Sequence, residues 1–363
     1  MDCTEQGGYI GQMENEAVFS NLKTVPIVLA ADDNFAPVFA ACLSSILKTS
    51  SPARTYDIVL LHAGMSDEHI EKLSGMTSGC ENVSLRFVDV RTLHEVQHLK
   101  AGGHISRETY FRFMIPDAMP EYDKVLYLDC DITVLSDVAE LYDTDITGYT
   151  LAAVRDAEFA GHLGGADKTI QRYINTELGM KDPENYFQAG VLLLNTAAMR
   201  KKHTCSEWMK LAEKWYRYHD QDILNVECEG EVLYLDMSWN VITDCDHTRI
   251  SNVVSYARPQ IQDEYRDARK APKVVHYAGH VKPWQSEGED MGGYFWDAIK
   301  NTPYSESTHS AMLEYQRQKA AQQEAEAASL KVKLKKAAAK IINAIFPKGS
   351  KINYFLRKVF KKD

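Results

Sequence analysis

The chain has 363 residues, 45% of them hydrophobic and 25% charged. This length and composition are sufficient to form one large domain or two ordinary ones, each with a buried core. Its formal net charge is -10, but residues 331–363 carry +10, so that the remainder carries -20. An acidic body argues against nucleic-acid binding. Seven cysteines without a C-x-x-C pair indicate neither a disulfide framework nor a structural zinc site.

Residues 1–24 form an N-terminal extension that lacks the basic start and the apolar core of a signal peptide. No run of about 18 apolar residues occurs anywhere in the chain. We therefore expect a cytoplasmic protein that does not span a membrane.

From Val25 onward, short apolar runs alternate with amphipathic segments, which predicts an α/β fold with a mainly parallel sheet covered on both faces. Strands are expected at 25–31, 56–62, 83–90, 124–129, 149–156, 189–195, 232–236 and 271–279. Helices are expected after the first strand, from Ser66 to about Ser78, over 106–115, and from Thr196 through Trp208 and Trp215.

Residues 304–340 are rich in Ala, Gln, Glu and Lys, and we expect one main domain over 25–300 and a helical linker over 301–330. In 331–363, a break at 347–349 separates two basic helices with apolar faces. Those faces consist of Leu334, Ala338, Ile341, Ile342 and Ile345, and of Ile352, Phe355, Leu356, Val359 and Phe360. Such a tail is typical of a segment that lies on an anionic membrane surface. A hairpin docked on the body or on a second subunit is the alternative.

The stretch KVLYLDCDITV, at 124–134, runs from a buried strand into two carboxylates separated by one cysteine. Because side chains alternate along a strand, Asp129 and Asp131 should point to one side and Cys130 to the other. The carboxyl ends of parallel strands open into the ligand crevice of an α/β sheet. Two adjacent carboxylates repel each other, so a divalent cation is their natural partner. An acidic turn without function is the alternative.

The same stretch has two enzymatic interpretations. D-x-D-x-T after an apolar strand is similar to the nucleophile loop of haloacid-dehalogenase-type phosphatases, in which Asp129 would be phosphorylated and Asp131 would be the general acid. A D-x-D also holds the metal and diphosphate of nucleotide-sugar glycosyltransferases. A phosphatase of that type would carry its motif on the first strand, whereas this motif follows several strands.

Five strings decide between these interpretations when they are taken in order: AADDN (30–34), HISRETYFR (104–112), YFQAGVLLLN (186–195), DQDILN (220–225) and HYAGHVKPW (276–284). Together with the D-x-D, they closely resemble glycosyltransferase family 8, the retaining group that includes bacterial lipopolysaccharide galactosyltransferases and glycogenin. The resemblance covers roughly residues 25–290. It implies a GT-A type, Rossmann-like nucleotide-sugar-binding fold, here with a C-terminal helical tail.

The resemblance also implies the site residues. Asp129, Asp131 and His276 would bind the metal, with Mn²⁺ favoured over Mg²⁺ because His276 offers an imidazole. The nucleotide sugar would be bound by Ala30, Asp32, Asn34, His104, Ile105, Arg112, Asp129, Cys130, Asp131, Gln188, Ala189, Gly279 and Lys282. The residues at the reacting face would be Gln221, Asp220 and Asp156. Asp222 is expected to hold its own loop by hydrogen bonds.

The implied function is metal-dependent, retaining transfer of a hexose from UDP-galactose or UDP-glucose to a glycan or lipid-linked saccharide at the inner face of the membrane. Gln188 departs from the family, which usually has Asn in YFNAG, so that donor or acceptor preference is expected to differ. A non-catalytic nucleotide-sugar-binding protein is a further alternative, against which the intact set of metal ligands argues.

Overall fold

The structure is a computed structural model that describes residues 23–93, 107–345 and 349–359. The chain divides into two compact units, Met1–Glu306 and Ser307–Asp363, which are described separately. His104 and Ile105, most of the N-terminal extension, the expected break around residue 347 and Phe360 lie outside the described residues.

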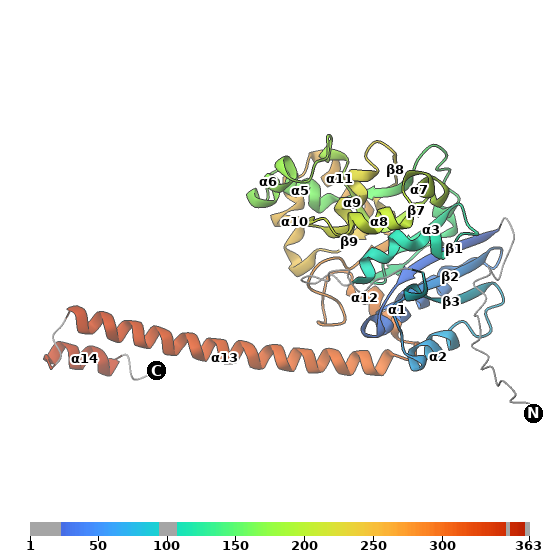
Figure 1. Cartoon of the computed structure of the whole chain (residues 1–363). Helices are drawn as coiled ribbons and strands as arrows, with labels where there is room; N and C mark the ends of the chain where they lie inside the picture. Colours follow the sequence, from blue (N-terminus) through green and yellow to red (C-terminus); the bar gives the residue numbers. More distant parts are fainter. Residues whose placement is uncertain (1–22, 94–106, 346–348, 360–363) are drawn as a thin grey trace, which may run out of the picture. The chain divides into compact units, whose positions relative to one another are not determined.

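The first unit is built on a seven-stranded sheet in the order β3-β2-β1-β4-β7-β6-β8. Figure 1 shows β1, β2 and β3 of this sheet side by side. Its strands are β1 (Thr24–Ala30), β2 (Thr55–His62), β3 (Val83–Asp89), β4 (Val125–Leu128), β6 (Leu151–Arg155), β7 (Phe187–Leu194) and β8 (Val232–Tyr234). The first four strands in that order are parallel, and β6 is parallel to β8. Only β7 runs against its neighbours. The prediction of an α/β fold with a mainly parallel sheet is confirmed.

Both faces of the sheet are buried, because successive residues of a strand alternate between two hydrophobic clusters. In β1, Ile27 and Leu29 belong to one cluster and Val28 to the other. Helices α1 (Ala36–Thr49) and α12 (Gly292–Ile299) are among those that supply residues to the first cluster. The second cluster takes residues from the 3-10 helix η3 (Arg107–Met114). This double burial explains why the strands are continuous apolar runs.

A smaller three-stranded sheet has the order β5-β10-β9. It consists of β5 (Ile132–Val134), β10 (Val274–His276) and β9 (Val241–Ile242). The three residues of the D-C-D turn connect β4 of the large sheet to β5 of the small one. Because β10 pairs with β5 so that His276 lies opposite Ile132, the small sheet brings residue 276 to the acidic turn.

The remaining helices are mostly short. They are α2 (Asp67–Gly75), α3 (Ile115–Ala118), α4 (Ala139–Tyr142), α5 (Ala157–Leu163), α6 (Lys168–Thr176), α7 (Thr196–Lys202), α8 (Cys205–Leu211), α9 (His219–Glu227), α10 (Arg249–Asn252) and α11 (Pro259–Ala268). The helix expected over 106–115 is the 3-10 helix η3 followed by α3. The helix after Ser66 ends at Gly75, and the Ser66 side chain makes no capping hydrogen bond.

The single long helix expected from Thr196 is wrong, because the chain breaks it into α7 and α8. Asn195, not Thr196, caps α7 by accepting from the Ala198 N–H. Thr204 then starts α8 with a capping box that it shares with Glu207. Thr196 is buried, and its hydroxyl donates to the Tyr122 carbonyl. The T-x-x-E signature in the sequence is the physical reason for the second start.

The second unit is helical. Helix α13 (Ser305–Ile345) begins at the end of the first unit and runs without interruption across the expected boundary at residue 331, and α14 (Lys351–Val359) follows. Leu334, Ile341, Ile352 and Phe355 are exposed, whereas Ile342 is buried. None of the described helices is both long and apolar enough to cross a bilayer. The division into linker and tail stays a prediction.

Candidate active site

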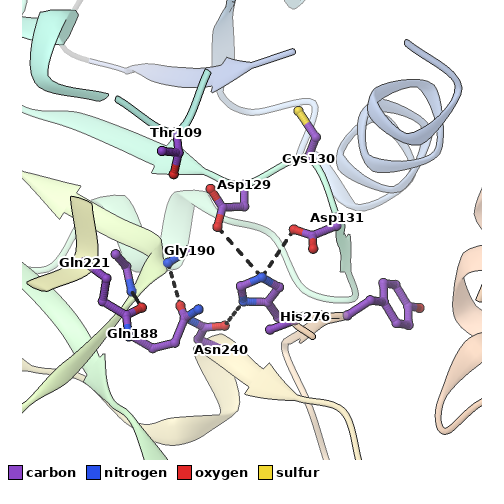
Figure 2. Close-up of polar contacts among 12 residues, drawn as sticks. Thr109, Asp129, Cys130, Asp131, Gln188, Gly190, Gln221, Asn240 and His276 are labelled. Carbon is purple, nitrogen blue, oxygen red and sulfur yellow. Dashed lines mark hydrogen bonds and ion pairs between the residues drawn. The ribbon is translucent and has the colours of Figure 1, made fainter. Parts of the chain in front are cut away.

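The two acids of the D-C-D turn share one side of the chain, as alternation predicts. Figure 2 shows Asp129 and Asp131 directed towards His276, with Cys130 turned away. The Cys130 thiol lies in the first hydrophobic cluster, where its Sγ is 3.2 Å from the Ala30 carbonyl oxygen. The Asp129 N–H donates to the Gly190 carbonyl at 2.8 Å, which fixes the turn against β7.

His276 completes a three-sided cluster with these acids. Its Nε2 lies 3.2 Å from Asp131 Oδ1 and 3.8 Å from Asp129 Oδ2, and one ligand atom from each of the three residues lies within 4.8 Å of the others. Two carboxylates and one imidazole are a donor set that suits a first-row divalent cation such as Mn²⁺. The three residues therefore fit the implied metal.

The absence of a side chain at Gly190 leaves room for Asp129 and His276. Sequence reasoning did not single out this glycine. A Cβ at this position would lie 2.3 Å from His276 Cε1 and 2.8 Å from Asp129 Oδ2, closer than real Cβ contacts come. Glycine inside a strand often marks the close approach of a ligand or of another chain segment. The position of Gly190 within the apolar run of β7 was therefore a usable signal.

Each acid of the turn is paired with a buried or half-buried cation. Arg112 Nη2 lies 3.0 Å from Asp129 Oδ1, which also accepts from the Tyr127 hydroxyl at 2.7 Å. Lys282 Nζ lies 2.7 Å from Asp131 Oδ2. Burial opposes ionisation of Asp131, but the positive charge of Lys282, aided by the contact with His276, outweighs it and holds the pKa of this carboxyl well below its usual range. Asp131 is therefore ionised.

Arg112 is only 3% exposed and joins two parts of the site. Its Nη1 donates to the Ala189 carbonyl at 2.6 Å and lies 3.0 Å from Asp220 Oδ2. It thereby connects the metal-ligand cluster to the start of α9. Its expected contact with a sugar or phosphate stays a prediction.

The segment that carries Lys282 needs glycine at position 279. Gly279 has φ +115°, a left-handed conformation that other residues rarely adopt, and a Cβ there would lie 2.7 Å from Arg249 Nη2. Arg249 Nη2 in turn donates to the Ala278 carbonyl at 2.8 Å. Lys282 Nζ also donates to the Tyr277 carbonyl at 2.8 Å, so the lysine is held within its own loop.

The three expected catalytic residues come together around the start of α9. Gln221 Nε2 donates to Asp156 Oδ2 at 3.1 Å, and Gln221 Oε1 accepts from the Ala189 N–H at 2.9 Å. Asp220 accepts from the Thr109 hydroxyl at 2.6 Å. Asp222 accepts from the hydroxyls of Tyr173 and Tyr186 and from the Tyr218 N–H, the loop-holding role expected of it.

Asp156 caps α5 by accepting from the Phe159 N–H at 2.9 Å. Burial, aided by the nearby charge of Glu158, raises the pKa of Asp156 from 3.8 to about 6. A carboxyl whose pKa is higher in the folded state favours folding only while it is protonated. The contribution of Asp156 to stability is therefore present below pH 4 and is lost as the pH rises through 6.

We expect the free energy of unfolding of Asp156→Asn, measured relative to the unchanged protein, to rise between pH 4 and 6.5. The rise should be at most ~3 kcal/mol, since each pKa unit corresponds to about 1.4 kcal/mol. Urea titrations of both proteins across this range measure it. A difference that stays constant with pH would show that the pKa of Asp156 is not raised.

The AADDN string forms a tight turn after β1. Asp32 caps the 3-10 helix η1 (Asp33–Phe35), with Oδ1 accepting from the Phe35 N–H at 2.9 Å. Asn34 Nδ2 donates to Asp32 Oδ2 at 3.1 Å. Asp32 is thus the cap of this 3-10 helix. The nucleotide contacts of Ala30, Asp32 and Asn34 stay predictions.

Two amide side chains stand behind His276 in a chain of hydrogen bonds that was not predicted. Asn240, at the end of the 3-10 helix η5 (Met237–Asn240), has its Oδ1 3.0 Å from His276 Nδ1. Asn240 Nδ2 donates to Gln188 Oε1 at 2.6 Å. Gln188, expected to contact a sugar, therefore contacts the hydrogen-bond partner of His276. Nothing in the sequence links positions 188, 240 and 276.

A second group of side chains of the types that ligate metals lies near Gly279 and consists of Cys245, Asp246 and His280. His280 Nδ1 lies 3.7 Å from Cys245 Sγ, and its Nε2 lies 2.7 Å from Asp246 Oδ2. Asp246 and His280 are both exposed. One ligand atom from each of Cys245, Asp246 and His280 lies within 4.8 Å of the others, as in the first cluster, but exposed acidic groups of this kind are common without a bound ion.

Comparison with known proteins identifies the chain's relatives. The sequence profile described as Glycosyl transferase family 8 matches residues 26–288. General stress protein A of Bacillus subtilis is 28% identical over 267 residues, which cover 72% of this chain and 87% of that protein. A lipopolysaccharide 1,3-galactosyltransferase of Salmonella typhimurium is 28% identical over 215 residues, covering 56% of this chain and 57% of that one.

Two solved structures are also similar. The apo structure of the bifunctional glycosyltransferase WbbM is 32% identical with a TM-score of 0.73, and the match covers 82% of this chain and 54% of that chain. The galactosyltransferase LgtC, in complex with donor and acceptor sugar analogues, is 27% identical with a TM-score of 0.62, over 77% of this chain and 96% of that chain. The chain thus spans little more than half of WbbM and nearly all of LgtC.

Proposed function

The chain belongs to glycosyltransferase family 8 and is a hexosyltransferase, and from this premise we propose that it is metal-dependent and transfers galactose or glucose from a UDP-sugar, with retention of configuration. The proposed acceptor is a glycan or lipid-linked saccharide, such as lipopolysaccharide or a surface polysaccharide. The observation that carries the proposal is the convergence of Asp129, Asp131 and His276 on one point at the edge of the sheet.

A divalent cation held by these three residues would act as a Lewis acid towards the departing diphosphate. Lys282, 2.7 Å from Asp131, adds a positive charge at the same place. Arg112 orients Asp129 through its ion pair. The chain's own contribution is thus a fixed set of charges placed where the leaving group's charge develops.

Retention requires front-face attack or two successive displacements. Gln221 is a poor nucleophile, and its amide is held by Asp156 and by the Ala189 N–H. Asp220 is buried and paired with Arg112, which favours a role in orienting groups over one in attack. We therefore propose front-face attack, in which the leaving phosphate takes the acceptor's proton. Asp156 and Asp220 are the candidates should a covalent intermediate form.

We expect release of UDP when the protein is mixed with an acceptor and UDP-galactose or UDP-glucose in the presence of Mn²⁺. EDTA should stop the reaction, and excess Mn²⁺ should restore it, because the diphosphate's charge is otherwise uncompensated. A UDP-release assay over several nucleotide sugars, with Mg²⁺ as a second metal, measures this. Turnover that EDTA leaves unchanged would refute metal dependence.

The tail is proposed to lie on an anionic membrane surface at the cytoplasmic face. The exposed apolar residues Ile352 and Phe355 stand among lysines, and each basic residue near such a surface contributes roughly 1 kcal/mol. Lying in the interface requires no helix that crosses the bilayer.

We expect deletion of residues 331–363 to abolish co-sedimentation with phosphatidylserine vesicles while UDP-sugar hydrolysis continues. The double change Ile352→Ser and Phe355→Ser should weaken binding strongly, whereas Leu330→Ser, equally exposed but within the expected linker, should not. Vesicle binding by the truncated protein equal to that of the full chain would refute the proposal.

The phosphatase interpretation of D-x-D-x-T loses its support. Asp129 follows β4, which comes after three other strands in the described part of the chain, and the family match is to glycosyltransferases. A binding protein without turnover would bind the donor yet yield no product with any acceptor, which the same assay detects.

A further inference from the structure

The two amides behind His276 form a chain of hydrogen bonds that starts at the backbone of β7. The Gly190 N–H donates to Gln188 Oε1 at 2.5 Å, and Asn240 Nδ2 donates to the same oxygen at 2.6 Å. Asn240 Oδ1 then lies 3.0 Å from His276 Nδ1 (Figure 2). The side chains of all three are buried, with 9%, 4% and 2% exposure for Gln188, Asn240 and His276.

The direction of every bond in this chain follows from its first member. A backbone N–H can only donate, so the Gln188 atom that it meets must be the carbonyl oxygen. The Asn240 atom facing that oxygen must then be the amide nitrogen, which leaves the Asn240 oxygen facing His276. An amide oxygen only accepts, so His276 must carry a proton on Nδ1.

We propose that Gln188 and Asn240 are positioning residues that keep the proton of His276 on Nδ1, so that the lone pair of Nε2 is presented to the cation between Asp129 and Asp131. The inference rests on the proposed function only in that the cluster binds a divalent cation. A ligating histidine is oriented by what its other nitrogen donates to. Here that acceptor is an amide whose own orientation is fixed by a second amide.

Without Gln188, the Asn240 amide could turn over and present its NH₂ group to His276 Nδ1. His276 would then have to accept at Nδ1 and place its proton on Nε2, where it would block the cation. An unpaired polar group at this buried position would cost free energy, because little water can reach the three side chains to form the missing hydrogen bond.

The same geometry gives Gln188 a role in addition to the sugar contact expected of it, which stays a prediction. Its carbonyl oxygen already accepts from Gly190 and from Asn240, which occupies both lone pairs. That oxygen has no capacity left for a sugar hydroxyl. Gln188 would therefore influence catalysis through the metal ligand, and its substitution should alter metal affinity before it alters donor choice.

The first test is ¹⁵N NMR of histidine-labelled full-length protein with Cd²⁺, a diamagnetic probe, using His276→Asn to assign the signal. The unchanged protein should show an exchange-protected Nδ1–H and a cadmium-bound Nε2. Asn240→Leu should lose the protected Nδ1–H, and Gln188→Leu should show it reduced. A protected Nδ1–H that is unchanged in both variants would overturn the proposal.

The second test is Mn²⁺ affinity, measured with the metal alone by the EPR signal of the free ion. Asn240→Leu and Gln188→Leu should raise the Kd by about 10- to 100-fold, the usual effect of losing the partner of a ligating histidine. Gln188→Glu keeps an acceptor oxygen at the same place and should bind nearly as the unchanged protein does. Asn82→Leu removes hydrogen bonds to the Ser51 and Arg54 carbonyls and is the control for general destabilisation.

The double variant Gln188→Leu with Asn240→Leu distinguishes two cases. In the first, Gln188 acts on His276 through Asn240, an arrangement that we call the relay. In the second, the two residues act independently. If Gln188 acts through Asn240, the double variant should bind Mn²⁺ no more weakly than Asn240→Leu alone. Fully additive losses, or a Gln188→Glu protein as weak as Gln188→Leu, would overturn the proposal. Should Asn240→Leu fail to fold, the Gln188→Leu and Gln188→Glu pair still decides it.

These results are independent of transferase activity. A protein that behaves as expected in both tests but turns over no UDP-sugar would refute the proposed function and leave the relay intact. A protein that transfers hexose normally while Asn240→Leu keeps its Mn²⁺ affinity would refute the relay alone.

Discussion

Replacing Asp131 by asparagine should reduce hexose transfer by at least about 10³-fold in kcat/KM, a loss of roughly 4 kcal/mol of transition-state stabilisation. The change keeps the shape of the side chain but removes its charge. His276 Nε2 and Lys282 Nζ, 3.2 and 2.7 Å from the carboxylate, would then face a neutral group. The cation's site would thereby lose one of its two negative charges.

Kinetic assays of Asp131→Asn at saturating Mn²⁺, together with Mn²⁺ titration, measure the effect. Asp145→Asn is the matched control, since Asp145 accepts from Thr147 in an exposed turn and touches no part of the site. Its activity should equal that of the unchanged protein. A folded Asp131→Asn protein with more than about a tenth of normal kcat/KM would contradict the assigned role, given that one charged group at such a site usually matters far more.

Replacing Gly190 by alanine should be almost as damaging, although it removes no functional group. The added methyl would lie 2.3 Å from His276 Cε1 and 2.8 Å from Asp129 Oδ2, so at least one of these ligands must move. A displacement of about 1 Å in such a site costs on the order of 10²-fold in rate. Crowding of the buried strand should also cost about 1–3 kcal/mol of stability.

The comparison for Gly190→Ala is Gly75→Ala, because a Cβ at Gly75 would meet nothing within 4 Å. That control should retain full activity and Mn²⁺ affinity. The informative readout is the Mn²⁺ Kd of Gly190→Ala at a temperature where circular dichroism shows it folded. A Kd equal to that of the unchanged protein would mean that the ligands do not stand as close to β7 as described.

Much of the fold follows from local patterns in the sequence. Runs such as YDIVLLH and AGVLLLN are short, apolar on both faces and rich in strand-forming residues, which favours strands covered on both sides, and they lie in β2 and β7. The alternation of side chains along an extended chain correctly predicted that Cys130 points away from Asp129 and Asp131. The helix starts at Asn195 and Thr204 also had visible signals, but the expectation of a single long helix overrode them.

The contacts that position the ligands could not be predicted. Asn240 meets His276 only because β9 and β10 pair in the small sheet, a contact between segments 36 residues apart that no local pattern encodes. Arg112 was predicted from the sequence to offer its charge to a substrate. Tertiary packing instead buries it between Asp129 and Asp220. The positions of ligand-bearing elements followed from sequence, but their hydrogen-bond partners did not.

The central claim is that Asp129, Asp131 and His276 hold the divalent cation. Crystals soaked with MnCl₂ and UDP, with diffraction data collected at the manganese absorption edge, test it most directly. We expect one strong anomalous peak within coordination distance of both carboxylates and of His276 Nε2. A peak elsewhere, for example between Cys245 and His280, with none beside Asp131, would contradict the account.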